Sequence, residues 1–273
     1  MSHDTDGNWR LIGTGFYISH DGLFVTARHV MEDVLRDGRQ MQPLAIFHLM
    51  SSSGLFGPQE YLVRPVAQCW IGERADIALG VAGTMTSNQT GQTLLSPWRW
   101  PLLWTPPPIG TAVGTYAFPN HAIHRVADRQ LIKWRPDFYF GVIHQAGDYR
   151  DSVMVPYPYF YADYRIHGGS SGGPVFLQGS GVYGVNCTEL APDGPGFGAQ
   201  VRCLQDAFIE GNLSSDEETV PRRVTFAELV SAGAVTVAGF TPSSIAPQIG
   251  RVVRFDTILP TARGPDMEFV VYT

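Results

Sequence analysis

Residues 168–175 read Gly-Gly-Ser-Ser-Gly-Gly-Pro-Val, and this stretch decides how the 273-residue chain is interpreted. Two pairs of glycines enclose the serines Ser170 and Ser171. Glycine tolerates backbone conformations that other residues avoid, so this composition fits a tight turn around a serine. Taken alone, the stretch would equally fit a flexible glycine loop, and its meaning depends on what accompanies it.

Two further patterns lie upstream of the serines. Residues 24–30 read Phe-Val-Thr-Ala-Arg-His-Val, and residues 74–79 read Arg-Ala-Asp-Ile-Ala-Leu. Separately, His29 could be a hydrogen-bonded core histidine and Asp76 a cap at the start of a strand. Together with a serine, they supply a nucleophile, a base that takes its proton and a carboxylate that orients the base.

The three patterns together resemble those of the trypsin-like (chymotrypsin-fold) serine peptidases. The family motifs Thr-Ala-x-His, Asp with an apolar trio, and Gly-x-Ser-Gly-Gly-Pro correspond to residues 26–29, 76–79 and 169–174. The order His, Asp, Ser is that of this group and not of α/β-hydrolases or subtilisins. The resemblance covers about residues 9–210.

The resemblance implies peptide-bond hydrolysis through an acyl-enzyme, with no cofactor. His29, Asp76 and Ser171 would form the catalytic triad, in which the histidine takes the serine proton and later donates it to the leaving amine. The backbone N–H groups of Gly169 and Ser171 would form the oxyanion hole. The substrate would be a protein or peptide.

The resemblance also implies an all-β fold with two antiparallel six-stranded β-barrels of the chymotrypsin type and a C-terminal extension. Residues 9–105 would form the N-terminal barrel with the histidine and the aspartate, and residues 106–210 the C-terminal barrel with the nucleophile. Residues 211–273 would be a linker and extension. The 30 glycines and 20 prolines agree with many short strands joined by turns.

Local patterns add detail to this expectation. Residues 11–18 read as a strand broken by glycines, and a short helix should follow His29. In the extension, Thr225 and Glu228 match a capping box that predicts one helix. Residues 234–273 read as strands again. The extension is a candidate docking surface for a regulatory protein, or it simply packs on the second barrel.

Substrate preference is expected from residues around the nucleophile. If the family alignment holds without gaps, Arg165 lies six residues before the nucleophile, where the floor of the primary pocket is set. Asn186, Cys187 and Thr188 would form the strand that pairs with the substrate backbone, and Gly196 the opposite pocket wall. An arginine at the floor would favour Asp or Glu before the cut. The alternative is that it faces solvent or pairs with a nearby aspartate, leaving a pocket for small or apolar side chains.

One departure from the secreted trypsin-like zymogens concerns activation. Those proteins carry an aspartate before the nucleophile that pairs with a new N-terminus, whereas this chain has Ser170. The three cysteines are far apart in the sequence and form no CxxC pair, so a disulfide framework is not expected. The chain is therefore similar to bacterial, disulfide-free members such as the HtrA-like group, with regulation by a partner or by loop ordering.

Composition excludes several other classes. The net charge of −6 and the lack of a Lys/Arg cluster argue against a nucleic-acid partner. No apolar run is long enough for a membrane span, and the polar N-terminus has no signal-peptide pattern, which predicts a cytoplasmic protein. The histidines at 121, 124, 144 and 167 do not have the spacing of a zinc site, so no metal is expected.

Two alternatives to the peptidase interpretation stay open at the level of sequence. The first is a catalytically silent trypsin-fold module that binds a peptide or protein partner. The second is an esterase-like acyl hydrolase. An intact set of His, Asp and Ser motifs argues against the first alternative. Only a comparison of ester turnover with peptide turnover distinguishes an acyl hydrolase from a peptidase.

Overall fold

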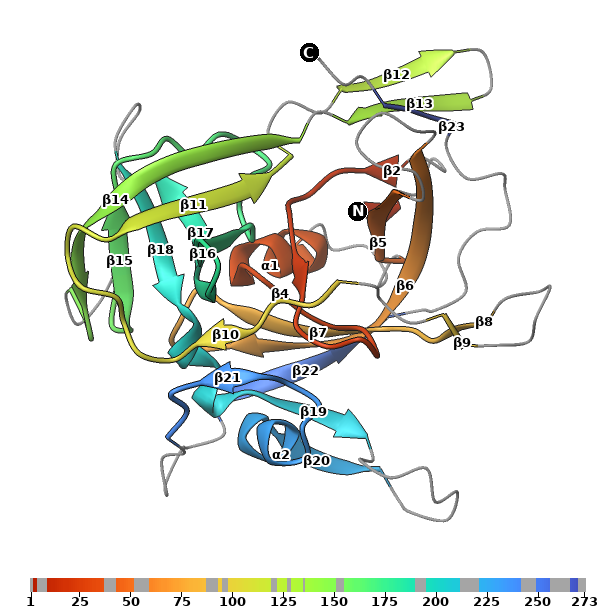
Figure 1. The fold of residues 1–273 in the computed structure, drawn as a ribbon. Helices are drawn as coiled ribbons and strands as arrows, with labels where there is room; N and C mark the ends of the chain where they lie inside the picture. The colour runs from red at the N-terminus through yellow and green to blue at the C-terminus, as the bar shows by residue number, and fades with distance from the viewer. Residues whose placement is uncertain are drawn as a thin grey trace.

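The computed structural model describes residues 2–3, 9–36, 43–51, 59–86, 93–94, 98–118, 122–126, 129–134, 136–150, 155–189, 195–211, 221–241, 249–255 and 266–269. Within these ranges the chain forms mainly short β-strands, with two α-helices and one 3-10 helix. Figure 1 shows the strands in two groups, the first drawn mainly in red and orange and the second in yellow, green and cyan.

The second group is a closed six-stranded barrel. Its strands are β11 (Ala112–Ala117), β14 (Asp137–Gly147), β15 (Tyr159–Ala162), β18 (Gly196–Gln200), β17 (Gly181–Glu189) and β16 (Pro174–Leu177). Neighbours in this order are antiparallel, and β16 also pairs with β11, which closes the ring. Its interior is filled by a separate cluster of buried side chains that includes Ile143, Phe160, Val175 and Tyr183.

The first group is an open sheet over the described residues. Its strands run in the order β22 (Gly250–Arg254), β6 (Gln59–Gly72), β7 (Ala78–Ala82), β4 (Leu23–Thr26) and β3 (Phe16–Tyr17), and β5 (Ala45–Ser51) pairs with β6. The helix α1 (Arg28–Arg36) follows β4 and buries Val30 and Met31 against this sheet. The expected strand at residues 11–18 is limited to β3, since the glycine-rich segment before it joins no ladder.

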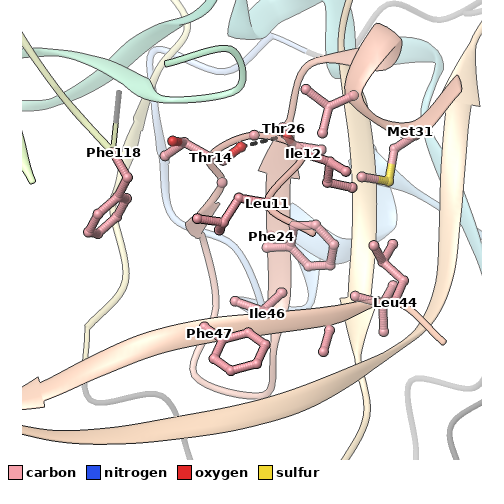
Figure 2. Close-up of a pocket in the computed structure, with 15 residues that line it drawn as sticks. Leu11, Ile12, Thr14, Phe24, Thr26, Met31, Leu44, Ile46, Phe47 and Phe118 are labelled. Atoms are coloured by element: carbon pink, nitrogen blue, oxygen red, sulfur yellow. Dashed lines mark hydrogen bonds between the residues drawn. The ribbon is translucent and has the colours of Figure 1, made fainter. Parts of the chain in front are cut away.

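A cavity lies at the open side of the first sheet. Its volume is about 80 Å³, it is partly open to solvent, and it lies between the segment before β3, α1 and β5. Figure 2 shows the apolar side chains that line it, including Leu11, Phe24, Leu44 and Phe118. The reacting groups predicted above do not line this cavity.

The C-terminal extension contributes strands to both groups. β22 joins the first sheet by antiparallel pairing with β6. β21 (Val237–Ala238) pairs in parallel with β10 (Leu102–Leu103), which in turn pairs with β17 of the closed barrel. Figure 1 shows β21 and β22 in blue, at the lower side of the two groups of strands. The extension is therefore part of the folded body and not only a tail.

The predicted capping box is confirmed. Thr225 accepts a hydrogen bond from the backbone N–H of Glu228, whose side chain in turn accepts from the Thr225 N–H. This reciprocal pair satisfies two N–H groups at the start of α2 (Phe226–Ser231), which buries Phe226 and Leu229.

The remaining elements are short. They are β1 (Ser2–His3), β2 (Trp9–Arg10), β8 (Met85–Thr86), β9 (Thr93–Leu94), β12 (Ala122–Val126), β13 (Arg129–Trp134), the 3-10 helix η1 (Val201–Asp206), β19 (Phe208–Gly211), β20 (Arg222–Thr225) and β23 (Asp266–Phe269). No described helix is long and apolar enough to cross a membrane.

The predicted all-β, two-barrel architecture is confirmed, with one difference. The closed barrel corresponds to the expected C-terminal barrel, and the open sheet, a half-barrel over the described residues, corresponds to the N-terminal one. The strand β3 has two residues, and among the described residues it pairs with β4 and not with β5.

Candidate active site

His29 lies in the first turn of α1, directly after β4, and Asp76 lies in the bend between β6 and β7. Arg28 holds the two segments together, because its guanidinium donates to the carbonyl oxygens of Gly72 and Glu73 at 3.3 and 2.8 Å. The histidine and the aspartate are thus brought together by elements of the first sheet, although 47 residues separate them in sequence.

The His29 imidazole and the Asp76 carboxylate form a two-point contact. The ring Nδ1 is 2.8 Å from Asp76 Oδ2, and the His29 backbone N–H donates to Oδ1 at 2.9 Å. Both carboxylate oxygens are therefore used, which fixes the ring orientation and leaves Nε2 for another partner. The side chains are 36% and 19% exposed, so the imidazole is within reach of a substrate.

The electrostatics of this pair favour the ionised carboxylate and a readily protonated imidazole. Burial alone would lower the pKa of His29, but the hydrogen bond and charge of Asp76, helped by Asp33 and Glu32, raise it above its usual value. Burial would raise the pKa of Asp76, but the hydrogen bonds and charge of His29 lower it. A histidine with these properties can accept a proton near neutral pH.

The nucleophile loop, residues 168–173, connects β16 to the segment 163–167, in which buried and exposed residues alternate. Two of its glycines adopt positive φ angles, +91° at Gly169 and +87° at Gly172. Side chains other than glycine rarely adopt these angles, so the glycines permit the tight turn that the sequence predicts. Ser171 lies between them and is half-buried.

Hydrogen bonds hold almost every peptide of the loop. The Ser170 N–H donates to the His167 carbonyl, and the Gly173 N–H donates to the Ser170 carbonyl, both at 2.9 Å. Asn186 on β17 holds the other side, because its carbonyl accepts from the Gly172 N–H at 2.8 Å and its N–H donates to the Gly173 carbonyl at 2.9 Å.

The N–H groups of Gly169 and Ser171 are not held in this way. Within the described part of the chain neither of them donates to a hydrogen bond, nor does that of Gly168, whereas the N–H groups of Ser170, Gly172 and Gly173 all do. Two unpaired donors on either side of Ser170 in a fixed loop are suited to bind an anionic oxygen.

The Ser171 hydroxyl donates to the carbonyl oxygen of Cys187 at 3.1 Å. The thiol of Cys187 in turn lies 3.4 Å from the backbone oxygen of Asp76, so this residue lies between the nucleophile loop and the aspartate bend. Burial raises the pKa of the Cys187 thiol well above its usual value, which keeps it neutral. In this conformation the Ser171 hydroxyl is hydrogen-bonded to the Cys187 carbonyl.

The structure separates the residues expected to bind substrate into buried and exposed ones. Asn186 and Cys187 are buried, and Thr188 is exposed at the end of the ladder between β17 and β18. The Arg165 side chain is exposed. Gly196 is buried, and a side chain there would contact Tyr164 and Ile166. The roles of these residues in specificity stay predictions.

A buried polar network behind the loop escaped the sequence analysis. The Tyr164 hydroxyl donates to Asn186 Oδ1 at 2.9 Å, and Asn186 Nδ2 donates to Thr115 Oγ1 at 2.6 Å. These two bonds orient the side-chain amide of Asn186. The backbone of the same residue holds the nucleophile loop. No sequence signal connects these residues, because each belongs to a different strand or loop of the closed barrel.

The sequence model of the trypsin-like peptidase domain matches residues 13–185, more than half of the chain. No curated protein matches the chain in sequence. Among solved structures, Deg5 shares 16% identity at a TM-score of 0.49, over 69% of this chain and 78% of that one.

Two further structures are similar at this level. The HtrA-type protease AlgW, solved with a decapeptide, shares 16% identity at a TM-score of 0.46, over 71% of this chain and 50% of that one. The MamO protease domain from Magnetospirillum magneticum shares 15% at 0.46, over 70% and 85%. The present chain thus matches half of the length of AlgW.

The sequence match assigns the class of protein, a serine endopeptidase of trypsin-like fold. The chain belongs to the trypsin-like peptidase domain family. The family match begins at Gly13, includes the segments with His29 and Asp76, and ends at Val185, beyond the nucleophile loop.

Proposed function

We propose that the chain cleaves peptide bonds through an acyl-enzyme on Ser171, with His29 as general base and Asp76 as its orienting carboxylate. The observation that carries the proposal is the contact between His29 Nδ1 and Asp76 Oδ2 at 2.8 Å. It selects the tautomer whose Nε2 lone pair can take a proton.

The first half of the reaction forms the acyl-enzyme. Ser171 Oγ attacks the scissile carbonyl carbon while its proton passes to His29 Nε2, and the carbonyl oxygen becomes an oxyanion. The unpaired N–H groups of Gly169 and Ser171 would receive that charge. The hydroxyl must first turn from the Cys187 carbonyl to the imidazole. Collapse of the tetrahedral intermediate then breaks the C–N bond, the leaving amine takes the proton from His29, and the acyl-enzyme is formed.

The second half of the reaction restores the serine. A water molecule then gives a proton to His29 and attacks the ester carbon. The acid product leaves, and the proton returns to Ser171 Oγ. Asp76 stays ionised throughout, in keeping with its lowered pKa.

The test compares two adjacent serines. Ser171→Ala should lower kcat on a protein or peptide substrate by roughly 10⁶, and His29→Ala by nearly as much, because the triad acts as a unit. Ser170→Ala is the matched control. Its Oγ is buried and has no hydrogen-bond partner within the described residues, so its loss should leave turnover near wild type.

The outcomes separate the alternatives. Wild-type turnover by Ser171→Ala would contradict the proposal. Peptide binding without turnover by the wild type would favour the silent binding module. Turnover of esters but not of peptides would favour an acyl hydrolase.

We also propose that Arg165 favours Asp or Glu before the cut. Its exposed side chain lies between buried Tyr164 and Ile166, at the approach to the nucleophile loop. A peptide library scanned at that position measures this preference. Cleavage after Lys or Arg would contradict it, and cleavage after Leu or Ala would favour an arginine that only faces solvent.

Location and regulation are proposals as well. Cys69, Cys187 and Cys203 are buried free thiols, which suits a reducing compartment such as the cytoplasm. With Ser170 in place of a carboxylate, control by a protein partner is proposed in preference to a freed N-terminus. Cleavage near residue 8 that strongly activates the protein would contradict this.

A further inference from the structure

Thr14 reaches from the first sheet to the nucleophile loop of the closed barrel. Its backbone N–H donates to the carbonyl oxygen of Ser171 at 2.8 Å. Its hydroxyl donates to the carbonyl oxygen of Gly169 at 2.7 Å, across 155 residues of sequence. Thr14 thus holds the carbonyl oxygens of both residues whose N–H groups are predicted to form the oxyanion hole.

Thr14 is itself held in place. The hydroxyl of Thr26, on β4, donates to the Thr14 carbonyl at 2.7 Å, a contact drawn as a dashed line in Figure 2. Thr14 and Thr26 are both buried. The nucleophile loop fits closely against them, since a Cβ at Gly172 would overlap Thr14 O and Thr26 Oγ1.

The side-chain bond acts on a particular peptide. The peptide between Gly169 and Ser170 lies between the two unpaired donors, and its rotation would change the angle between them. Its N–H is held from within the loop by the His167 carbonyl, and its carbonyl by Thr14 Oγ1. Oxyanion stabilisation depends on donors that are fixed before charge develops. A bond that resists this rotation therefore bears on the transition state more than on the substrate.

We propose that Thr14 is a positioning residue, and that its hydroxyl keeps the Gly169 and Ser171 N–H groups aimed at the developing oxyanion. This inference rests on the proposed acyl transfer at Ser171. The alternative role is purely structural. In that case the hydroxyl would link the two barrels, and its loss would not change the turnover of the molecules that fold.

The test uses substitutions at Thr14 and one matched threonine. Thr14→Val keeps the backbone N–H and the shape but removes the hydroxyl, and Thr14→Ser retains the hydroxyl. Thr14→Val should lower kcat about tenfold with KM unchanged, less than the roughly 10²–10³ lost with a direct oxyanion donor. Thr14→Ser should restore turnover. Thr111→Val, which removes an exposed hydroxyl bonded to a backbone carbonyl at 2.6 Å, should act like wild type.

A second readout isolates the oxyanion. A peptide aldehyde that adds to Ser171 forms a hemiacetal whose oxygen occupies the oxyanion position, so Thr14→Val should weaken its inhibition by the same factor as kcat. Binding of an uncleaved peptide should be equal in Ser171→Ala with and without Thr14→Val. Rates are normalised to the active sites titrated with a fluorophosphonate. If Thr14→Val does not fold, Thr14→Ala removes the same hydroxyl and should show the same loss of kcat and of aldehyde inhibition.

The outcomes are distinct. Normal wild-type turnover with unchanged kcat and aldehyde inhibition in Thr14→Val, once active sites are counted, would overturn the positioning role alone. A parallel loss in Thr14→Ser would also overturn it. A wild-type protein that neither cleaves peptide nor labels with fluorophosphonate would overturn the proposed function and this inference with it.

Discussion

The two barrels differ in how their strands are supplied. The closed barrel draws all six of its strands from residues 112–200. The first sheet needs β22, from residues 250–254 near the other end of the chain, and stays open beside the cavity. The nucleophile therefore belongs to a contiguous unit, whereas the His29–Asp76 pair belongs to one assembled from distant segments.

This difference shows that the two halves of the site depend on different contacts. The nucleophile loop is held by hydrogen bonds within its own barrel, mainly to Asn186, and by Thr14 from the other side. The His29–Asp76 contact depends on how α1 and the β6–β7 bend meet in the first sheet. A substitution can thus damage either the nucleophile loop or the His29–Asp76 pair and leave the other intact.

The largest effect is expected in the acid–base half. Asp76→Asn should lower kcat by about 10⁴, because the amide keeps the geometry but no longer selects the correct tautomer. Loss of the negative charge also lowers the pKa of His29, so the acid limb of the pH–rate profile should move to lower pH. Steady-state kinetics from pH 5 to 9 measure both, and an unmoved limb would contradict this electrostatic account.

The next effect concerns the contact between the barrels. Gly172→Ala should abolish most activity and lower the free energy of unfolding by more than the roughly 1–3 kcal/mol expected of a strained φ. The added methyl overlaps Thr14 O and Thr26 Oγ1. Gly179→Ala is the control: its φ is +75° but nothing lies within 4 Å of the new Cβ. Equal losses in thermal melts of the two variants would show that the contact does not matter.

A smaller and more local effect is expected from the extension strand. Val253→Pro removes an N–H from β22 and should cost about 1–2 kcal/mol locally. Amide exchange should speed up in the paired part of β6, around Cys69, while β16 and β17 keep their protection. Val253→Ala, which retains the N–H, should leave β6 protected. Uniform deprotection of both barrels would contradict their independence.

The smallest effect is electrostatic. Glu32→Gln should move the acid limb toward lower pH, and by less than Asp76→Asn, because the Glu32 charge contributes less than Asp76 to raising the pKa of His29. Glu210→Gln, which removes a carboxylate paired with Arg254 far along the chain, should leave the limb unchanged. Matched pH–rate profiles of the two variants decide the point.

The sequence predicts the features that local chemistry controls. The turn around Ser171 follows from its glycines, and the start of α2 follows from the capping box of Thr225 and Glu228. The two-barrel architecture comes from the family resemblance carried by the three motifs. The proximity of His29 and Asp76 was expected on the same ground, and their hydrogen bond agrees with it.

Other features depend on contacts that no local pattern encodes. The pairing of β22 with β6 joins segments about 180 residues apart, and no local pattern predicts that β3 pairs with β4 alone over the described residues. The Thr14 contacts were missed for the same reason, although the pattern Gly-Thr-Gly at residues 13–15 flanks that residue with the small neighbours a close approach needs.

The most direct test of the central claim is to map the site of a fluorophosphonate adduct and the pH dependence of its formation. The label should be found on Ser171 and not on adjacent Ser170, and its rate should rise as His29 loses its proton, above its usual pKa of about 6.5. A label on any other residue, no label on folded protein, or a rate independent of pH from 5 to 8 would contradict the account.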